Sequence, residues 1–347
     1  MEVAVIKEHA HARVGLLGNP SDIYHGKVIA LSVSNFRASV TLKANESGGD
    51  EAIAVVPGER DANGGKGRVR LLESLLKLFY QHPGLEDVRE ENKLGFSLSY
   101  ESSIPFQAGL SGSSAIICAA LRCLVRYYNV GDRIDKAVLP NLVLAAENAL
   151  GIVAGYMDRV IQVYGGAVFM DFAKEVFEAK GHGAYEELDP KVLPEHLYLM
   201  FPRPKAEAGS DEGGGESGKI HSNVRQRWLD GDEEAREAMR TFARLAEEGR
   251  EVLLRGEGEP GKPFAEIMRA NFKLRRSLFG DQVLGKANLD MVNLAESQGA
   301  AAKFTGSGGA IVVYCFEGED QAAALGKRCD ESGYTFLKIE VAEPSVW

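Results

Sequence analysis

The stretch Pro105-Phe-Gln-Ala-Gly-Leu-Ser-Gly-Ser-Ser-Ala115 decides how the rest of this chain is interpreted, because it leads into an apolar segment with helical spacing. Gly109 and Gly112 allow the backbone to approach a ligand and to adopt positive φ angles. The N-terminus of a helix presents unpaired N–H groups and a partial positive charge, which together bind anions. Ser113 and Ser114 add hydroxyl groups that suit phosphate oxygens or Mg²⁺.

A serine-capped helix is the alternative, but a cap does not require two glycines and three serines within six residues. The stretch predicts a phosphate-binding turn.

Strand-like and helix-like segments alternate on both sides of this turn. Strands are predicted over 13–17, 28–34, 38–43, 94–100, 167–172 and 196–201, and helices over 67–82, 111–128 and 136–150. Further helices follow from residue 221 to about 297, and the chain ends as strand, Gly-rich turn, strand, helix and strand. This order predicts an α+β fold.

The length of 347 residues suits two domains, which we place at 1–180 and 181–347. A flexible loop is predicted at about 204–218, because four of residues 209–215 are glycine and two are acidic, which leaves nothing to pack.

Bulk composition excludes several classes of partner. Hydrophobic residues make up 45% of the chain, so it can bury a core, and the net charge of −10 argues against a nucleic-acid or anionic-membrane surface. The four cysteines form no metal-binding spacing, which predicts buried, reduced thiols. The first 20 residues lack the unbroken apolar core of a signal peptide. We expect a cytoplasmic protein that acts on small molecules; its oligomeric state is left open, and a monomer is compatible with the sequence.

Three segments together resemble the GHMP kinase superfamily, which includes galactokinase, homoserine kinase and mevalonate kinase. They are residues 12–22 (ARVGLLGNPSD), the turn at 105–115, and residues 302–310 (AKFTGSGGA), and they occur in the order of the family. Within the superfamily the chain is most similar to plant-type glucuronokinases, through RVGLLGNPSD (13–22), IPFQAGLSGSSAI (104–116), PNLVLAAENALGIVAGYMDRVIQVYGG (140–166), KIHSNVRQRWLDGD (219–232) and KFTGSGGA (303–310).

The resemblance implies a two-domain fold with the active site in the cleft between the domains, and ATP and Mg²⁺ as cofactors. It implies phosphorylation of D-glucuronate at its anomeric hydroxyl, giving D-glucuronate 1-phosphate on the route to UDP-glucuronate. The alternatives are an anomeric kinase for fucose, a heptose, arabinose or galacturonate, a non-catalytic ligand-binding regulator, and a carboxy-lyase of the same fold. Asn19-Pro20 replaces the Glu-His pair of galactokinase-like members, which makes galactose a poor candidate.

The resemblance also implies roles for single residues. Asp158 matches the catalytic aspartate, whose carboxylate would accept the hydroxyl proton, and Arg13 matches an arginine beside the transferred phosphate. Glu147 and Ser114 are assigned to Mg²⁺, with Ser113 as the other possible serine. The ATP phosphates are assigned to Pro105, Ala108, Gly109, Leu110, Ser111, Gly112, Ser113, Ser114 and Ala115.

The sugar is assigned to Asn19 and Asp22 of the first motif and to Thr305, Gly306 and Ser307 of the third. A sugar acid carries a carboxylate, which bidentate arginine recognises well. Two pairs are candidates, Arg225 with Arg227 and Arg275 with Arg276, and we select Arg225 or Arg275. Residues so spaced on a helix point in different directions, so at most one of each pair points inward.

Overall fold

The computed structural model describes residues 4–45, 54–56, 65–91, 95–152, 154–203, 216–256 and 260–347. Most of the loop predicted at 204–218 lies outside the described residues, and its last three residues begin a helix. Within the described part of the chain, no helix is both long and apolar enough to cross a membrane. All four cysteines are free and buried, as predicted.

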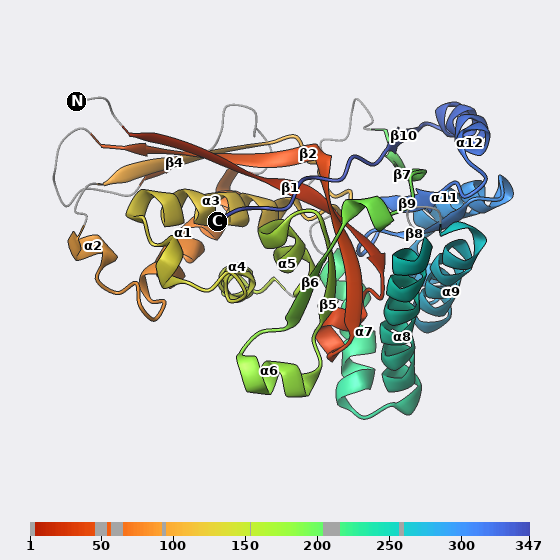
Figure 1. Ribbon diagram of the computed structural model, residues 1–347, viewed down its shortest axis with the longest axis horizontal. Coiled ribbons are helices and arrows are strands. Elements are labelled where there is room, and N and C mark those ends of the chain that lie inside the picture. The colour runs from red at the N-terminus through yellow and green to blue at the C-terminus, as the bar shows by residue number, and fades with distance from the viewer. Residues whose placement is uncertain are drawn as a thin grey trace.

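A six-stranded sheet occupies the N-terminal half of the chain (Figure 1). Its strand order is β3-β4-β2-β5-β6, with β1 paired to β2, and every pairing is antiparallel except that of β3 with β4. The strands are β1 (Val5–Leu17), β2 (Lys27–Ala44), β3 (Ala54–Val56), β4 (Phe96–Ser102), β5 (Ala167–Asp171) and β6 (Ala184–Leu188).

The prediction of two separate strands at 28–34 and 38–43 is wrong, because β2 runs through both. The interval between them, residues 35–37, lies at a bulge in the pairing with β1, where the register jumps from His11 opposite Arg37 to Ala12 opposite Val33. A bulge bends a strand without ending it, so the break in the hydrophobic pattern does not mark a turn. The result is a strand long enough to pair with β4 at one end and with β5 at the other.

Helices cover one face of this sheet, and the central one is α3 (Gly112–Tyr128), which packs on β1 and β2. Eleven of its residues are buried, which explains its continuous apolar sequence. Figure 1 shows α3 beneath the long strands with α4 and α5 close by. The other helices of this half are α1 (Gly65–Tyr80), α2 (Val88–Glu91), α4 (Leu139–Asn148), α5 (Met157–Tyr164) and α6 (Lys174–Lys180).

A second sheet, of order β10-β7-β9-β8 and fully antiparallel, lies in the C-terminal half. Its strands are β7 (Leu197–Pro202), β8 (Ala301–Phe304), β9 (Ile311–Tyr314) and β10 (Tyr334–Lys338). The helices are α7 (Glu216–Leu229), α8 (Glu233–Gly256), α9 (Gly261–Phe279), α10 (Asp281–Leu284), α11 (Lys286–Ser297) and α12 (Glu319–Glu331). The predicted ending of strand, turn, strand, helix and strand is confirmed.

The two halves are joined by more than the connection between β6 and β7. Helix α8 packs on β2, and the C-terminal residues return to the first sheet, where Val341 bridges Val33 and Pro344 bridges Gly165. The division into 1–180 and 181–347 remains a proposal. Strand β6 lies beyond residue 180 yet pairs with β5, so a boundary that respects the sheets falls after Leu188.

Candidate active site

The predicted phosphate-binding turn lies directly before α3 and against the third motif. Ser111 and Gly109 have φ angles of 64° and 63°, and α3 begins at Gly112. A Cβ atom on Gly109 would lie 2.0 Å from the carbonyl oxygen of Gly308, and one on Gly309 would lie 2.3 Å from that of Gln107. These glycines therefore allow two backbone segments from opposite halves of the chain to touch, a packing role that the sequence did not reveal.

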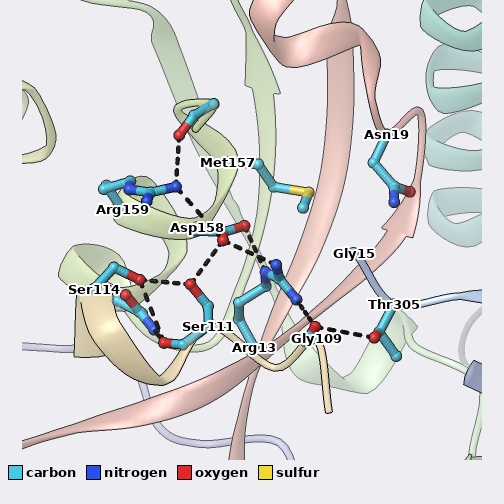
Figure 2. A network of polar contacts seen from close by, with 12 residues as sticks. Arg13, Gly15, Asn19, Gly109, Ser111, Ser114, Met157, Asp158, Arg159 and Thr305 are labelled. Carbon is cyan, nitrogen blue, oxygen red and sulfur yellow. Dashed lines mark hydrogen bonds and ion pairs between the residues drawn. The ribbon is translucent and has the colours of Figure 1, made fainter. Parts of the chain in front are cut away.

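Arg13 and Asp158 form the centre of the site (Figure 2). The Arg13 guanidinium donates from Nε to Asp158 Oδ1 at 2.5 Å and from Nη2 to Oδ2 at 2.8 Å, and its Nη1 donates to the carbonyl oxygen of Gly109 at 2.5 Å. The Ser111 hydroxyl donates to Asp158 Oδ2 at 2.7 Å. The first motif on β1, the turn before α3 and the first turn of α5 thus converge on one carboxylate.

The Asp158 carboxylate is ionised throughout the physiological pH range. Burial alone would raise the pKa of Asp158, but the positive charges of Arg13 and Arg159 and the hydrogen bonds from Arg13 and Ser111 outweigh burial and lower the pKa to about 2. Asp158 can therefore accept hydrogen bonds and, during a reaction, a proton, but it does not serve as an acid in the free protein.

Of the two serines considered for Glu147, the structure brings Ser113 into contact with it. The Ser113 hydroxyl donates to Glu147 Oε1 at 2.8 Å, whereas the fully buried Ser114 places its Oγ 2.5 Å from Ser111 Oγ. Successive residues of a helix point about 100° apart, so only one of the two adjacent serines can face α4. At this position it is Ser113.

Arg159 is a site residue that the sequence analysis missed. Its Nε donates to Glu147 Oε2 at 2.6 Å and its Nη1 to the carbonyl oxygen of Gly155 at 2.8 Å. Burial would lower the pKa of Arg159, but the carboxylates of Glu147 and Asp158 raise it, so the cation is firmly held. The only signal in the sequence was its place after Asp158, which says nothing about burial. Arg159 links the two carboxylates of the site.

Asp22 lies at the start of α5, beside Asp158. Its Oδ2 accepts a hydrogen bond from Met157 N at 3.1 Å, and a Cβ on Gly155 would lie 1.9 Å from that oxygen. Burial raises the pKa of Asp22 from 3.8 to about 6, against the effect of the Met157 hydrogen bond and with a further rise from the charge of Asp158. With these pKa values Asp22 changes charge near pH 6, whereas Asp158 changes charge near pH 2.

Asn19 is held by Lys303, a second residue that the sequence analysis missed. The buried Lys303 ammonium donates to Asn19 Oδ1 and to the carbonyl oxygens of Gly15 and Phe304, each at 2.8 Å. Burial, and then the charges of Arg275 and Arg13, lower the pKa of Lys303 well below 10.5. Lys303 is the first residue of the segment KFTGSGGA. A single lysine in a strand, however, gives no sign in the sequence of whether it is buried or exposed.

The third motif reaches the centre of the site through its first two predicted residues. Thr305 donates from Oγ1 to the carbonyl oxygen of Gly109 at 3.2 Å, as Figure 2 shows, and accepts at its own carbonyl from Gly15 N at 2.8 Å. A Cβ on Gly306 would lie 2.8 Å from Arg13 Nη2. Ser307 follows in the same turn and is half-buried.

The two arginine pairs behave as the helix geometry predicts. Arg275 is 2% exposed, while its neighbour Arg276 is half-buried and pairs with Asp281 at 2.6 Å. In the other pair, Arg225 is exposed and Arg227 pairs with Asp232 at 2.6 Å. One arginine therefore points into the protein, and it comes from α9.

Arg275 is buried, and no carboxylate among the described residues pairs with it. Its guanidinium carbon lies 5.3 Å from the ring centroids of both Phe279 and Phe304, and its Nε and Nη2 atoms have no hydrogen-bond partner among the described residues. Burial, and next the charge of Arg13, lower the pKa of Arg275 to about 10. Such a cation is costly to bury, which marks it as a candidate for binding an anionic ligand.

Comparison with known proteins gives consistent results. Residues 72–166 match the family model of the GHMP kinases N terminal domain. The chain is 45% identical to Glucuronokinase 1 of Arabidopsis thaliana over 98% of this chain and 93% of that protein. It is also 45% identical to Probable glucuronokinase 2 of the same plant, over 97% of this chain and 92% of that protein.

Solved structures with the same fold include two sugar or alcohol kinases. Lactococcus lactis galactokinase complexed with galactose aligns with a TM-score of 0.71 at 15% identity, covering 98% of this chain and 95% of that one. The mevalonate kinase of Methanococcus jannaschii aligns with a TM-score of 0.65 at 14% identity, covering 99% of both chains. At these identities the similarity establishes the fold.

Proposed function

Because this chain belongs to the GHMP kinase family and is 45% identical to plant glucuronokinases over nearly its whole length, we propose that it phosphorylates D-glucuronate. The γ-phosphate of ATP is transferred to the anomeric hydroxyl, and the products are D-glucuronate 1-phosphate and ADP. The observation that carries the proposal is the ionised Asp158 carboxylate, which Arg13 and Ser111 hold at the N-terminus of α3. A fixed cation, an anion-binding turn and a proton acceptor are what phosphoryl transfer requires of a protein.

The turn before α3 is assigned to the ATP phosphates. The turn leads into the N-terminus of α3, and Arg13 Nη1 lies beside it, at the carbonyl oxygen of Gly109. Residues Pro105 and Ala108 to Ala115 would bind the phosphate oxygens, and Arg13 would stabilise charge on the phosphoryl group during transfer.

Asp158 is proposed as the acceptor of the hydroxyl proton. As the anomeric oxygen forms its bond to phosphorus and the bond from phosphorus to the ADP oxygen breaks, the proton passes to the carboxylate and later to water. A pKa of about 2 makes Asp158 a weak base in the free protein. When phosphates arrive beside Arg13 they compete for its charge, which weakens its hold on Asp158 and raises the basicity of the carboxylate at the moment of reaction.

Glu147 and Ser113 are the residues that fit Mg²⁺. Mg²⁺ prefers a few carboxylate and hydroxyl oxygens with phosphate and water completing its shell, and the Glu147–Ser113 contact supplies one of each beside the phosphate turn. Mg²⁺, when bound, neutralises charge on the ATP phosphates. Arg159 positions the Glu147 carboxylate for this role.

A pair of serine variants tests the metal assignment. We expect Ser113→Ala to raise the Mg²⁺ concentration needed for half-maximal activity by about tenfold, because one oxygen ligand is lost. Ser114→Ala is expected to leave that concentration nearly unchanged, since its hydroxyl faces Ser111. Titration of ADP release with Mg²⁺ measures both, and a larger effect for Ser114→Ala than for Ser113→Ala would restore the original assignment.

Asn19, Asp22, Thr305, Gly306 and Ser307 are proposed to contact the sugar. Lys303 takes the Oδ1 of Asn19, which leaves the Nδ2 group as a donor. The Asp22 carboxylate, when ionised, can accept from sugar hydroxyls.

The pKa of Asp22 predicts a pH dependence. Its value of about 6 lies above the ordinary 3.8, so the carboxylate is protonated below pH 6 in the folded protein and kcat/KM should fall about tenfold per pH unit there. In Asp22→Asn this fall of kcat/KM below pH 6 should disappear, whatever the absolute activity of the variant. Loss of activity through unfolding can be told apart from this titration. Because the pKa of Asp22 is raised in the folded protein, its contribution to the free energy of unfolding is largest at about pH 4 and declines as the pH rises to about 6. Thermal melts across that range provide the check.

The decisive experiment is coupled ADP release with Mg²⁺-ATP against a panel of sugars and uronic acids, with the product identified by ³¹P NMR. Release with glucuronate and an anomeric phosphate product would support the proposal. Turnover with fucose, a heptose, arabinose or galacturonate instead would keep the kinase and replace the substrate. Binding without turnover would support a regulator, and release of CO₂ with inorganic phosphate a carboxy-lyase. A cytoplasmic location is part of the proposal, supported by four free, buried cysteines.

A further inference from the structure

Two polar side chains on α9 lie four residues apart, Asn271 and Arg275, and both are buried. Side chains at this spacing occupy the same face of a helix. That face is turned toward the first and third motifs, because Asn271 bonds to Gly18 and the Arg275 guanidinium stacks on Phe304. Figure 1 shows α9 beside β8, the strand that supplies Lys303.

The amide of Asn271 has a fixed orientation. Its Oδ1 accepts a hydrogen bond from Gly18 N at 2.8 Å, in the turn that carries Asn19. Its Nδ2 is buried and has no hydrogen-bond partner among the described residues, and the same holds for Nε and Nη2 of Arg275. One helix face thus presents three buried donors that lack acceptors. Nearly all buried donors have a partner, and a bound ligand or a water supplies one where the protein does not.

The charges near these donors make the missing acceptor an anion. Arg13 is neutralised by Asp158, whereas the acceptors around Lys303 are two carbonyl oxygens and an amide oxygen, which carry no charge. Arg275 lies over the rings of Phe279 and Phe304, and no carboxylate among the described residues pairs with it. A carboxylate offers two oxygens with about four acceptor positions, which suits an amide N–H and a guanidinium edge together.

We propose that Asn271 is a further specificity-determining residue, which donates from Nδ2 to the substrate carboxylate that Arg275 binds. The inference rests on the proposed function and extends it from one arginine to a two-residue site that distinguishes a sugar acid from a neutral sugar. A hydroxymethyl group in place of the carboxylate would leave buried donors unpaired, and sites of that kind reject the wrong ligand strongly. The hydrogen bond to Gly18 fixes Asn271 against the turn that carries Asn19, so recognition of the carboxylate is linked to the position of the sugar.

Asn271→Asp is the informative variant, because the two side chains have the same shape and aspartate still accepts from Gly18 N. Its second oxygen, however, repels a carboxylate and accepts from an amide. We expect the KM for glucuronate to rise at least 30-fold, with kcat and the KM for ATP changed less than threefold. For glucuronamide, whose carboxamide is neutral and can donate, the KM should stay the same or fall. A purely structural role for Asn271 would raise both KM values alike.

Asn35→Asp is the matched control, since Asn35 also accepts a backbone N–H through Oδ1, from Glu340 at 3.0 Å, on a different surface. It should leave both KM values unchanged. Equal KM changes for glucuronate and glucuronamide in Asn271→Asp would overturn the inference. If that variant does not fold, the wild-type protein provides the test. A ratio below threefold between its KM values for glucuronamide and glucuronate would also overturn the inference. Failure of wild-type turnover with glucuronate would instead remove the proposed function itself.

Discussion

Asp158→Asn is expected to lower kcat for glucuronate phosphorylation by about 10³-fold, within the 10² to 10⁴ range typical of a lost proton acceptor. Asparagine keeps the size of the side chain but cannot take up the hydroxyl proton. It also leaves the Arg13 guanidinium, now held at 2.5 and 2.8 Å by the carboxylate, without a counter-charge. The KM for ATP should change less than threefold, because the phosphate turn is intact. Coupled ADP release measures both quantities.

The control for this variant is Asp132→Asn, the same change at an exposed aspartate in the segment between α3 and α4. It should retain full activity. The wild-type kcat should also show no titration of Asp158 between pH 5 and 9, since its pKa lies near 2. A kcat for Asp158→Asn within tenfold of the wild type would remove Asp158 from the catalytic role and leave it as an ion-pair partner of Arg13.

Arg275→Gln is expected to raise the KM for glucuronate by about 100-fold, because truncating one partner of a buried, hydrogen-bonded charge pair costs roughly 2–5 kcal/mol. The effect on kcat should be small, since Asp158 and Arg13 are untouched. The melting temperature without substrate should not fall, because the free protein is relieved of a buried cation that has no anionic partner in the described part of the chain. Weaker binding without loss of stability is the signature of a residue that serves the ligand.

Arg276→Gln provides the matched control on the adjacent residue, whose guanidinium pairs with Asp281 in solvent. Exposed pairs of this kind contribute about 0–1 kcal/mol to stability, and we expect an unchanged KM. Arg225→Gln tests the alternative that the sequence analysis left open. A larger KM effect for Arg225→Gln than for Arg275→Gln would move the carboxylate site to α7.

Much of the fold and part of the site could be predicted from local chemistry. A glycine- and serine-rich turn before an apolar helix favours an anion site, and α3 begins where the pattern predicts. The order of strands and helices from β4 to β5, and again from β7 to the C-terminus, also follows from hydrophobic periodicity, whereas α6 and β6 were not predicted. Asp158 and Arg13 came from the family resemblance, and their mutual contact confirms that the segments converge.

The remaining features depend on contacts between distant residues, which a single sequence does not display. Whether Ser113 or Ser114 meets Glu147 depends on how α3 is rotated against α4. Whether residues 28–43 form one strand or two depends on a bulge opposite β1. Which arginine is buried, and that Asn271 stands beside it, depends on the packing of α9 against β8 and the end of β1.

The sequence by itself determined the class of chemistry, because phosphate binding needs residue types that are rare in such spacing. Only the tertiary structure decided which side chains act together. Lys303, Arg159 and Asn271 look like ordinary polar residues in the sequence, and burial distinguishes them. Burial removes the competing water, so a buried charge or donor must find a partner in the protein or in the ligand. That requirement appears only when elements far apart in the chain are brought together.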